Sequence, residues 1–482
     1  MEPLPSNFLF GVASADHQFE AYDPAFPPDV WDWWEQRGEV PQARGNATDF
    51  WHRYPEYLRL ARSLGCTAFR FSIAWARVEP RPGEFDQNVL THYATLAQEI
   101  RRLGMEPIVT LCHYVWPMHL QVDGGLAGRN FPNRFAAYVR EVRDALRPHV
   151  RYWLTFNEPD DLVVSHSNLQ PRFPPNAPMW NKFGDQVNVM EALIRNIFLA
   201  HRNARAILRE GSDGANAMVS LNSDVRGFPI YLRRLLNWWV ARHLPSARSI
   251  RNAVGRIAAT QPTEAMAVGA SHFYRTLALL FDGDWLEMGS LGRLPNHLCP
   301  EGCENQLDYL AFDWYYAVRW PWQIRRLTEG IDGHFERAPV YAPALFDVLT
   351  YFDQQFKQVY PPHGKPILIA ENGLVDQAGA YIQRGQTPPP GVVDQATYLR
   401  NHMFQIQRAH AAGVKFIGYC VWSLISNREW GLRLNPGTDF GLYRIDLDND
   451  PALRDRSLPL TPVPGPAVET YREIIRQRGV KT

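Results

Sequence analysis

The stretch Ile367-Leu368-Ile369-Ala370-Glu371-Asn372-Gly373 decides the fold class. Four apolar residues in a row, followed at once by Glu371, are typical of a strand that is buried on both faces and ends in a polar side chain. Residues 152–157 have a similar form and are followed by Glu158 and Pro159. Both stretches therefore predict strands of a parallel sheet, each with a carboxyl group at its end.

Short apolar segments of this kind recur along the whole chain and alternate with longer amphipathic ones. The expected strands are residues 8–13, 67–73, 106–112, 152–157, 217–222, 309–314, 366–371 and 416–422. The expected helices are residues 49–64, 88–103, 131–146, 185–209, 395–412 and 467–477. Three of these helices are followed directly by a glycine, which commonly ends a helix, at Gly65, Gly104 and Gly413.

Eight strands, each followed by a helix or a helix-bearing segment, predict an α/β protein built as a single (β/α)8 TIM barrel. The alternative is an open doubly wound sheet, but no Gly-x-Gly-x-x-Gly follows the first strand, so its dinucleotide-binding version lacks support. We expect residues 1–482 to form one domain with a helical insertion between strands five and six, at about residues 223–308. Residues 228–243 and 271–285 are the expected helices of that insertion.

The overall charge argues against one class of partner. The 482 residues carry 50 basic and 50 acidic side chains, so the formal net charge is zero, and a nucleic-acid partner, whose binding depends on neutralising phosphates, is not expected. The start of the chain does not have the pattern of a signal peptide, and no apolar run reaches membrane-spanning length. These features predict a cytoplasmic protein with no integral membrane segment, and they leave its oligomeric state open.

Glu158 and Glu371 are the candidate catalytic residues. Both end expected strands, and the active site of a TIM barrel lies at the C-terminal ends of its strands, so we expect the two carboxyl groups to share one cleft. One such glutamate alone is better interpreted as a solvent-facing charge, but two on the same rim are not. Two facing carboxyl groups are what cleavage of a glycosidic bond requires, and their separation, which the sequence does not give, decides between retention and inversion.

The order of motifs along the chain resembles glycoside hydrolase family 1, the retaining β-glycosidases that include β-glucosidases and β-galactosidases. The matching motifs are Phe10-Gly11-Val12-Ala13 with Gln18 and Glu20, Phe69-Arg70-Phe71-Ser72-Ile73-Ala74-Trp75, His113, Asn157-Glu158-Pro159, Glu371-Asn372-Gly373, Trp422-Ser423-Leu424, Glu429-Trp430 and Phe440-Gly441. Asn-Glu-Pro alone also occurs in related barrel glycosidases, whereas the ordered combination is specific. Residues 168–175, which include Arg172-Phe173-Pro174-Pro175, are similar to the archaeal-type members.

The resemblance implies a role for each matching residue. Glu158 would be the general acid/base, Glu371 the nucleophile, and Asn157 would hydrogen-bond the sugar 2-hydroxyl. Tyr315 would donate to Glu371, and Arg70 beside that carboxylate would favour its ionised form. The residues implied to contact the rest of the same sugar ring are Gln18, His113, Glu429, Trp430 and, as an apolar platform, Trp422. Taken singly, several of these side chains are better interpreted as structural.

Several positions depart from the family pattern and leave the sugar and aglycone preference open. Tyr114 and Asp313 stand where the family usually has Trp and Asn, and we expect both among the substrate-binding residues. Asp313 adds a third carboxyl group near the nucleophile, which is expected to raise the pKa of a neighbouring acid. Glu429 is similar to the position that binds hydroxyls of non-phosphorylated sugars, and its charge would repel a 6-phosphate. The remaining departures are Ala21, Leu126, Trp314 and Ser426.

The resemblance implies a retaining exo-β-glycosidase, most simply a β-glucosidase, that uses a small-molecule β-glycoside and needs no metal or organic cofactor. A β-galactosidase, a β-fucosidase or a transglycosylating member of the same family stays open. A catalytically silent sugar-binding protein on the same fold is the alternative from another class, and the presence of both carboxyl groups disfavours it. An endo-acting glycanase of a neighbouring barrel family is disfavoured by the long insertion, which suggests a closed pocket.

Aromatic residues make up 13% of the chain, and several fall in or just after the expected insertion. If these side chains face the cleft, the aglycone is large and apolar, such as an aryl, steryl or lipid group. If they face inward, the protein is an ordinary oligosaccharide or aryl-glucoside hydrolase. The residues concerned are Phe228, Trp238, Trp239, Phe273, Phe281, Trp285, Trp320 and Trp322.

Overall fold

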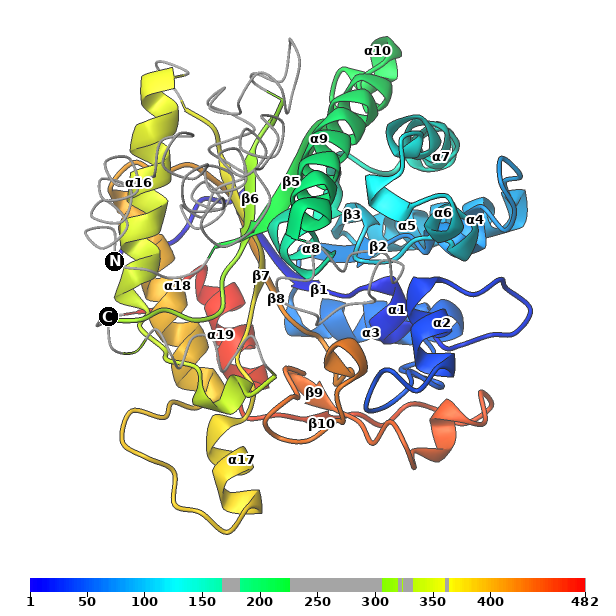
Figure 1. Ribbon diagram of the computed structural model, residues 1–482. Helices are drawn as coiled ribbons and strands as arrows, with labels where there is room; N and C mark the ends of the chain where they lie inside the picture. The colour runs from blue at the N-terminus through cyan, green and yellow to red at the C-terminus, as the bar shows by residue number, and fades with distance from the viewer. Residues whose placement is uncertain (167–182, 226–305, 320–322, 324–332, 360–363, 482) are drawn as a thin grey trace, which may run out of the picture.

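Eight parallel strands close into a barrel at the centre of the molecule (Figure 1). The computed structural model describes residues 1–166, 183–225, 306–319, 323, 333–359 and 364–481. Its barrel strands are β1 Leu9–Ala13, β2 Ala68–Ser72, β3 Glu106–Cys112, β4 Tyr152–Asn157, β5 Met218–Asp224, β6 Leu310–Asp313, β7 Ile367–Asn372 and β8 Phe416–Val421. Pairing of β1 with β8 closes the circle. The predicted TIM-barrel fold class is therefore confirmed.

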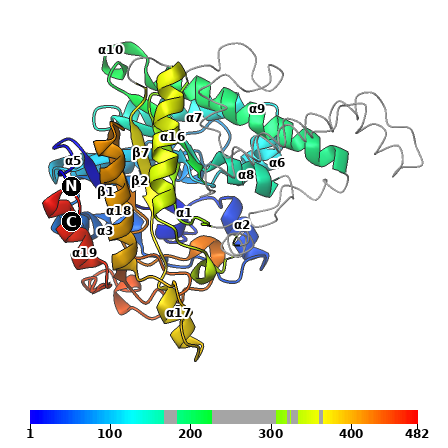
Figure 2. The same cartoon turned by 90° about the vertical axis from the view of Figure 1, so that its left-hand side faces the viewer.

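Helices surround the barrel strands. They are α1 Asp16–Phe19, α2 Val30–Gln36, α3 Phe50–Leu64, α4 Trp75–Val78, α5 Gln87–Arg102, α6 Met118–Val122, α7 Phe131–Leu146, α8 Pro159–His166, α9 Phe183–Leu208, α10 Gly211–Gly214, α16 Pro343–Val359, α17 Gln377–Gln383, α18 Gln395–Ala411 and α19 Val468–Gln477. A small antiparallel pair, β9 Tyr443–Arg444 and β10 Val463–Pro464, lies outside the barrel. The views of Figures 1 and 2 agree that α16 and α18 run side by side.

The local sequence explains where individual elements begin and end. All five residues of β2 are buried, as its uninterrupted run of mostly apolar residues predicts. Helix α3 ends at Gly65, which has a left-handed φ of 95°. Asp394 caps α18 by accepting a hydrogen bond from the backbone N–H of Thr397. The expected and observed bounds of the strands and helices differ by at most two residues. At strand ends such differences arise because the last pairings of a strand depend on its neighbours.

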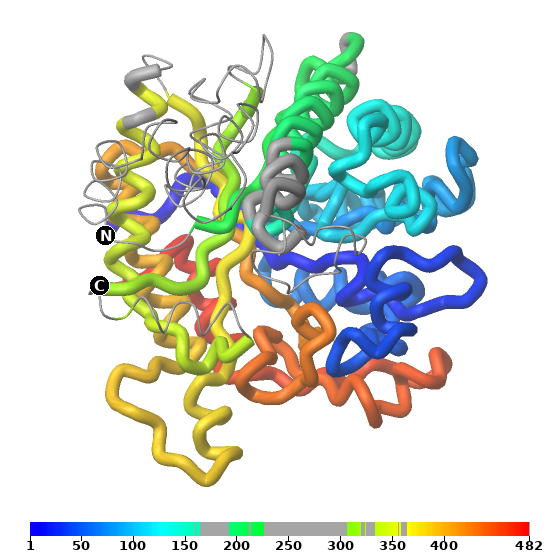
Figure 3. Tube along the Cα trace, in the orientation of Figure 1, coloured from blue at the N-terminus to red at the C-terminus, as the bar shows by residue number. Residues whose placement is uncertain are grey.

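The two ends of the chain meet on one side of the barrel, as the Cα trace in Figure 3 also shows. The backbone N–H of Leu4 donates to the carbonyl of Arg478 at 2.8 Å, and the Tyr471 hydroxyl on α19 donates to the carbonyl of Gly11 on β1 at 2.6 Å. The last helix therefore fastens the first strand. Within the part of the chain that the structure describes, no helix combines the length and apolar character needed to cross a membrane.

Some expectations fall outside the described residues. The two helices expected within the insertion, the archaeal-type stretch at 168–175 and the eight aromatic residues tied to the aglycone all lie in the ranges 167–182, 226–305, 320–322 and 324–332. The division of residues 1–482 into one barrel domain with an insertion at about 223–308 stays a prediction.

Candidate active site

Glu371 lies on β7 at the C-terminal mouth of the barrel, with a hydrogen-bond donor on each carboxyl oxygen. Nη1 of Arg70 donates to its Oε1 at 2.5 Å, and the Tyr315 hydroxyl donates to its Oε2 at 2.6 Å. The expected contacts of Arg70 and Tyr315 with Glu371 are thus present. Burial nevertheless raises the pKa of Glu371 above its ordinary value, although Arg70 and Tyr315 both act to lower it. The expectation that Arg70 favours the ionised form is correct in direction, but desolvation outweighs it in the free protein.

Arg70 is fully buried and connects Glu371 to the strands around it. Besides Glu371, it donates from Nη2 to Oδ1 of Asn157 at 2.6 Å and from Nε to the Thr110 hydroxyl at 3.1 Å. Its rigid planar fork lets one cation fix acceptors on three strands at once. Asn157 and Glu371 are thus held in a fixed relation, although 214 positions separate them in the sequence (371 − 157 = 214).

Glu158 has a different environment from Glu371. It directly follows β4 with a φ of 37°, and its backbone N–H donates to the carbonyl of Asn222 at 2.8 Å. Its Oε2 accepts a hydrogen bond from the Tyr114 hydroxyl and lies 3.4 Å from Nδ2 of Asn157. Burial first, and then the nearby Asp313 carboxyl group, raise the pKa of Glu158 well above its usual value. This setting favours the protonated form of Glu158, which is the form that a general acid needs.

Asp313 ends β6 and is fully buried. It pairs with Glu371 across the β6–β7 ladder, and its Oδ2 accepts a hydrogen bond from Nδ2 of Asn222. Asn222 donates from the same nitrogen to Oδ1 of Asn157 at 2.8 Å. Asp313 thus reaches Asn157 through Asn222, and its carboxyl group, when ionised, raises the pKa of Glu158, which is the expected effect on a neighbouring acid.

A second group of polar side chains is built around Glu429. Its Oε1 accepts from Nε1 of Trp422 at 2.7 Å, and its Oε2 accepts from Nε2 of Gln18 at 3.2 Å. Gln18 also donates to Oδ1 of Asn427 at 3.1 Å. Three of the predicted sugar-contacting residues, which come from opposite ends of the chain, therefore form one hydrogen-bonded group.

His113 lies within an aromatic cluster beside this group. Its ring stacks on Trp422 with centroids 5.9 Å apart and on Trp430 at 5.7 Å, and it meets Tyr114 edge to face at 5.6 Å. Burial and the charge of Arg70 lower the pKa of His113 well below its usual value, so the imidazole is neutral. A neutral imidazole offers one donor and one acceptor nitrogen, which suits sugar hydroxyls.

Three of these residues have unusual backbone conformations. Tyr114, Glu158 and Trp430 adopt φ angles of 64°, 37° and 45°. Non-glycine residues rarely adopt positive φ, and where they do, the strain tends to be found at functional sites. The strain in this barrel mouth falls on residues that the sequence had singled out.

Several polar residues of the mouth were not predicted from the sequence. Asn222, Asn427 and Thr110 all hydrogen-bond predicted site residues. Asn222 lies near the end of a predicted strand, which is the one signal that marks it. Asn372, noted only as part of the family motif, links three further elements: its amide donates to Tyr398 of α18 at 2.8 Å and to the carbonyl of Trp314, and it accepts from Tyr419 of β8 at 2.6 Å.

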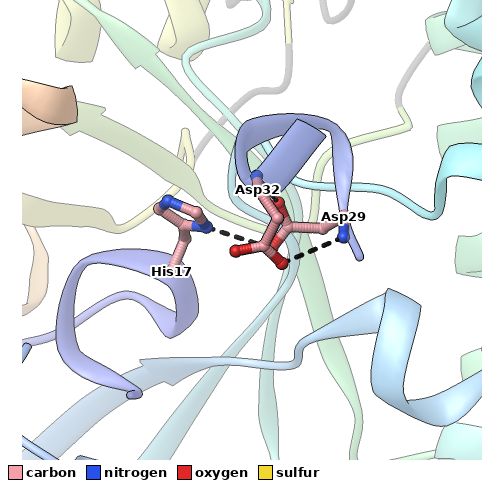
Figure 4. Close-up of side chains that lie close together, drawn as sticks. All are labelled: His17, Asp29 and Asp32. Atoms are coloured by element: carbon pink, nitrogen blue, oxygen red, sulfur yellow. Dashed lines mark hydrogen bonds and ion pairs between the residues drawn. The ribbon is translucent and has the colours of Figure 1, made fainter. Parts of the chain in front are cut away.

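A buried charged cluster surrounds His17, the neighbour of Gln18 on α1 (Figure 4). His17, Asp29 and Asp32 bring their ligand atoms within 4.8 Å of one another. Both nitrogens of His17 are already paired, with Asp29 at 3.0 Å and with Glu35 at 2.9 Å, and both oxygens of Asp32 accept from Arg44 at 2.7 Å. The cluster is therefore an ion-pair network in which Arg44 and protonated His17 supply the cations, and it supports α1, the helix that holds Gln18.

Comparison with known proteins agrees with this arrangement. The Arabidopsis thaliana protein "Beta-glucosidase 13" is 24% identical over 92% of this chain and 89% of its own. The Hellenia speciosa "Furostanol glycoside 26-O-beta-glucosidase" is 26% identical over 93% of this chain and 80% of its own. The structure of a β-glucosidase from Thermotoga maritima has the same fold, with a TM-score of 0.68, 19% identity and full coverage of both chains.

A barrel with two carboxyl groups of opposite character at its mouth is a known arrangement of glycoside hydrolases. The family model "Glycosyl hydrolase family 1" matches residues 1–229 and 309–457, well over half of the chain. The protein belongs to this family and is a glycoside hydrolase related to β-glucosidases. Residues 230–308 and 458–482 lie outside the match, and the first of these ranges falls within the predicted insertion.

Proposed function

We propose that this protein is a retaining exo-β-glycosidase, most simply a β-glucosidase, with Glu371 as nucleophile and Glu158 as general acid/base. The observation that carries the proposal is the contrast between the two carboxyl groups. Glu371 accepts hydrogen bonds from a guanidinium and a phenol, which stabilise its charge. Burial and neighbouring acids raise the pKa of Glu158 well above its usual value, which favours its protonated form. One carboxyl group is thus prepared to attack, and the other to donate a proton.

The first step forms a covalent glycosyl-enzyme. A carboxylate oxygen of Glu371 attacks the anomeric carbon, the bond to the glycosidic oxygen breaks, and Glu158 gives its proton to that oxygen so that the aglycone leaves as an alcohol. Glu371 is then an uncharged ester, so its charge no longer raises the pKa of Glu158. Glu158 is left as a carboxylate and becomes the base of the second step.

The second step releases the sugar. Glu158 takes a proton from a water molecule while the water oxygen attacks the anomeric carbon, and the bond to Glu371 breaks. The two inversions leave the product in the β configuration. An alcohol in place of water would give transglycosylation with the same residues.

The group around Glu429 supports a non-phosphorylated sugar. Its carboxylate is held by Trp422 and Gln18 and would accept hydrogen bonds from sugar hydroxyls, whereas it would repel a 6-phosphate. His113 and Trp430 would complete the contacts to the ring, and Asn157, held by Arg70, would bind the 2-hydroxyl. Relative kcat/KM values for p-nitrophenyl β-glucoside, β-galactoside, β-fucoside and the 6-phospho-β-glucoside measure this preference. Preference for the phosphorylated substrate would refute it.

The direct test is hydrolysis of p-nitrophenyl β-glucoside by the purified protein and by Glu371→Gln. We expect kcat to fall by about 10⁴-fold in the variant, while Glu469→Gln, a change at an exposed glutamate, leaves it unchanged. Proton NMR of the first product formed should show the β-anomer. Sugar binding without turnover in the parent protein would instead support a silent sugar-binding protein.

Glu158→Gln tests the second role. Because p-nitrophenolate leaves without needing a proton, this change should slow cleavage of the aryl glucoside much less than cleavage of cellobiose. An equal loss on both substrates would contradict the assignment of Glu158 as the acid.

A large apolar aglycone is the finer part of the proposal. It is supported by the aromatic composition of residues 226–322 and by the relative whose printed name specifies a furostanol glycoside. Turnover of a steryl glucoside should then exceed that of cellobiose. A clear preference for cellobiose would contradict the idea while leaving the β-glucosidase proposal intact.

A further inference from the structure

Asp313 brings a third carboxyl group to the level of the barrel at which Glu371 lies. In the sheet register, Asp313 of β6 pairs with Asp224 of β5 on one side and with Glu371 of β7 on the other. Both Asp313 and Glu371 are buried, at 0% and 4% exposure. Two carboxyl groups on neighbouring strands in such a setting do not both ionise readily, because water does not screen their repulsion.

The hydrogen bonds around the two carboxyl groups favour the charge on Glu371. Glu371 has a donor on each oxygen, and one of these donors is the guanidinium of Arg70. Asp313 has one neutral amide donor, from Asn222, on Oδ2. Its Oδ1 is buried and has no hydrogen-bond partner among the described residues. A buried carboxylate with one bare oxygen is costly, whereas a protonated carboxyl group in the same position is much less so.

We propose that Asp313 and Glu371 hold a single negative charge between them in the working enzyme, with the charge on Glu371 and the proton on Asp313. Asp313 is then a positioning residue: as a neutral acid it orients Asn222, and through it Asn157, without repelling the charge on Glu371. The proposal rests on the proposed role of Glu371 as nucleophile. Asp313 stands where the family usually has Asn. In its protonated form it is neutral, as the side-chain amide of an asparagine is.

The groups that face Asp313 agree with this assignment. They are Arg70 of β2, Asp224 of β5, Glu371 of β7, Cys420 of β8, Glu158 at the end of β4 and Tyr315 after β6. Burial first, and then the charge of Glu371, raise the pKa of Asp313 well above its usual value, and the attraction of Arg70 offsets this only in part. Burial also raises the pKa of the Cys420 thiol to about 12, so the thiol adds no charge near neutral pH.

Infrared spectroscopy tests the proposal without requiring turnover. In a Glu158→Gln background, which removes the other acid of the site, the C=O stretching band of a protonated carboxyl group should be present at pH 7. The further change Asp313→Asn should remove the Asp313 part of this band, while the part from Glu20, whose pKa burial raises to about 7, is the same in both proteins and cancels in the difference spectrum. An unchanged band would overturn the proposal, and so would a band that Glu371→Gln removes instead. Asp144→Asn, at an exposed carboxylate, controls for the loss of one acid.

A second variant covers the case in which Asp313→Asn fails to fold. In Glu371→Gln, the charge that raises the pKa of Asp313 is gone. The Asp313 band should therefore disappear at a pH at least about one unit lower than in the parent protein. Titration at the same pH in both proteins would overturn the coupling.

The pH profile of kcat/KM adds a readout that a purely structural role would not move. Ionisation of Asp313 at alkaline pH raises the pKa of Glu158 in the parent protein, and Asp313→Asn removes that charge. Normalised to each variant's own maximum, the alkaline limb should move to lower pH by about one unit, while the acid limb, set by Glu371, stays in place. A shift of the acid limb instead would place the proton on Glu371. Failure of the protein to hydrolyse β-glucosides would refute the proposed function, and the infrared experiment would still decide the protonation of Asp313.

Discussion

At the scale of single residues, Arg70 is the side chain on which the candidate site depends most. Its guanidinium contacts Glu371, Asn157 and Asn222, and all of these groups are buried. Breaking a buried ion pair by removing one partner costs about 3–5 kcal/mol, because the other charge is left without compensation. The position of Arg70 in the middle of β2 therefore ties the fold and the site together.

Tyr315→Phe is predicted to shift the acid limb of the pH profile. The Tyr315 hydroxyl lowers the pKa of Glu371 by donating to Oε2, so its loss raises that pKa. A nucleophile has to be ionised, so the acid limb of kcat/KM should move to higher pH, and kcat should fall about tenfold, as expected for losing a hydrogen bond to a charged group. Tyr381→Phe, at a half-buried tyrosine of α17 that is not among the site residues (Figure 1), is the control. An acid limb that stays in place would contradict the prediction.

At the scale of elements, the end of β7 is set by how closely β8 approaches it. A Cβ atom on Gly373 would lie 1.8 Å from the carbonyl oxygen of Trp422. Since Glu371 is two residues earlier and Trp422 directly follows β8, only glycine lets the two strand ends meet while both side chains face the mouth. Asn372, which lies between Glu371 and Gly373, holds the end of β7 in place by hydrogen bonds with Tyr398 of α18 and Tyr419 of β8.

Gly373→Ala is accordingly predicted to destabilise the protein by about 3 kcal/mol, the upper part of the range for overpacked cores. It should also lower kcat, because β7 has to move. Gly413→Ala is a matched control: its Cβ would meet nothing within 4 Å, so it bears only the strain of a φ of 96° and should cost about 1 kcal/mol. Denaturant unfolding measures both changes. Equal losses would show that the Trp422 contact can relax.

At the scale of the whole molecule, buried ionisable groups make the free energy of unfolding depend on pH, although the formal net charge of the chain is zero. The folded state raises the pKa of His17 from 6.5 to about 10, through Asp29 and Glu35 and against the effect of burial. Burial raises the pKa of Glu20 from 4.5 to about 7, although Arg77 opposes the shift. In both cases the folded protein binds a proton more tightly than the unfolded chain does.

The free energy of unfolding is therefore predicted to fall as the pH rises from about 7 to 10. Below that range the histidines whose pKa burial lowers act in the opposite direction, and they are His92, His113, His201 and His402. The contribution of Glu20 is complete below about pH 4.5 and is lost as the pH passes 7, and that of His17 is complete below about 6.5 and is lost towards 10. Each proton contributes a slope of at most about 1.4 kcal/mol per pH unit. Guanidinium unfolding between pH 7 and 10 should show the decline, and His17→Gln should flatten it while His149→Gln does not. A curve that rises over this range would contradict the assignment.

The sequence alone determined the barrel, the two carboxyl groups at strand ends and most of the residues around them, because apolar strand runs and ordered motifs are local features. It also named Arg70, Tyr315 and Glu429, through the order of family motifs rather than through physical chemistry. Asn222 and Asn427 escaped prediction because an isolated asparagine has no periodic signal, and only the folded barrel brings Asn157 to Asn222 and Gln18 to Asn427.

Only the tertiary structure decided how far the pKa values of the site carboxyl groups are shifted. From the sequence, Arg70 was expected to leave Glu371 readily ionised, whereas burial raises the pKa of that carboxyl group. Likewise, Asp313 became the partner of Glu371 only when β6 paired with β7. The identity of each residue can be read from the sequence. The shift of its pKa depends on desolvation and on charges brought together from distant strands, so the shift arises only in the folded molecule.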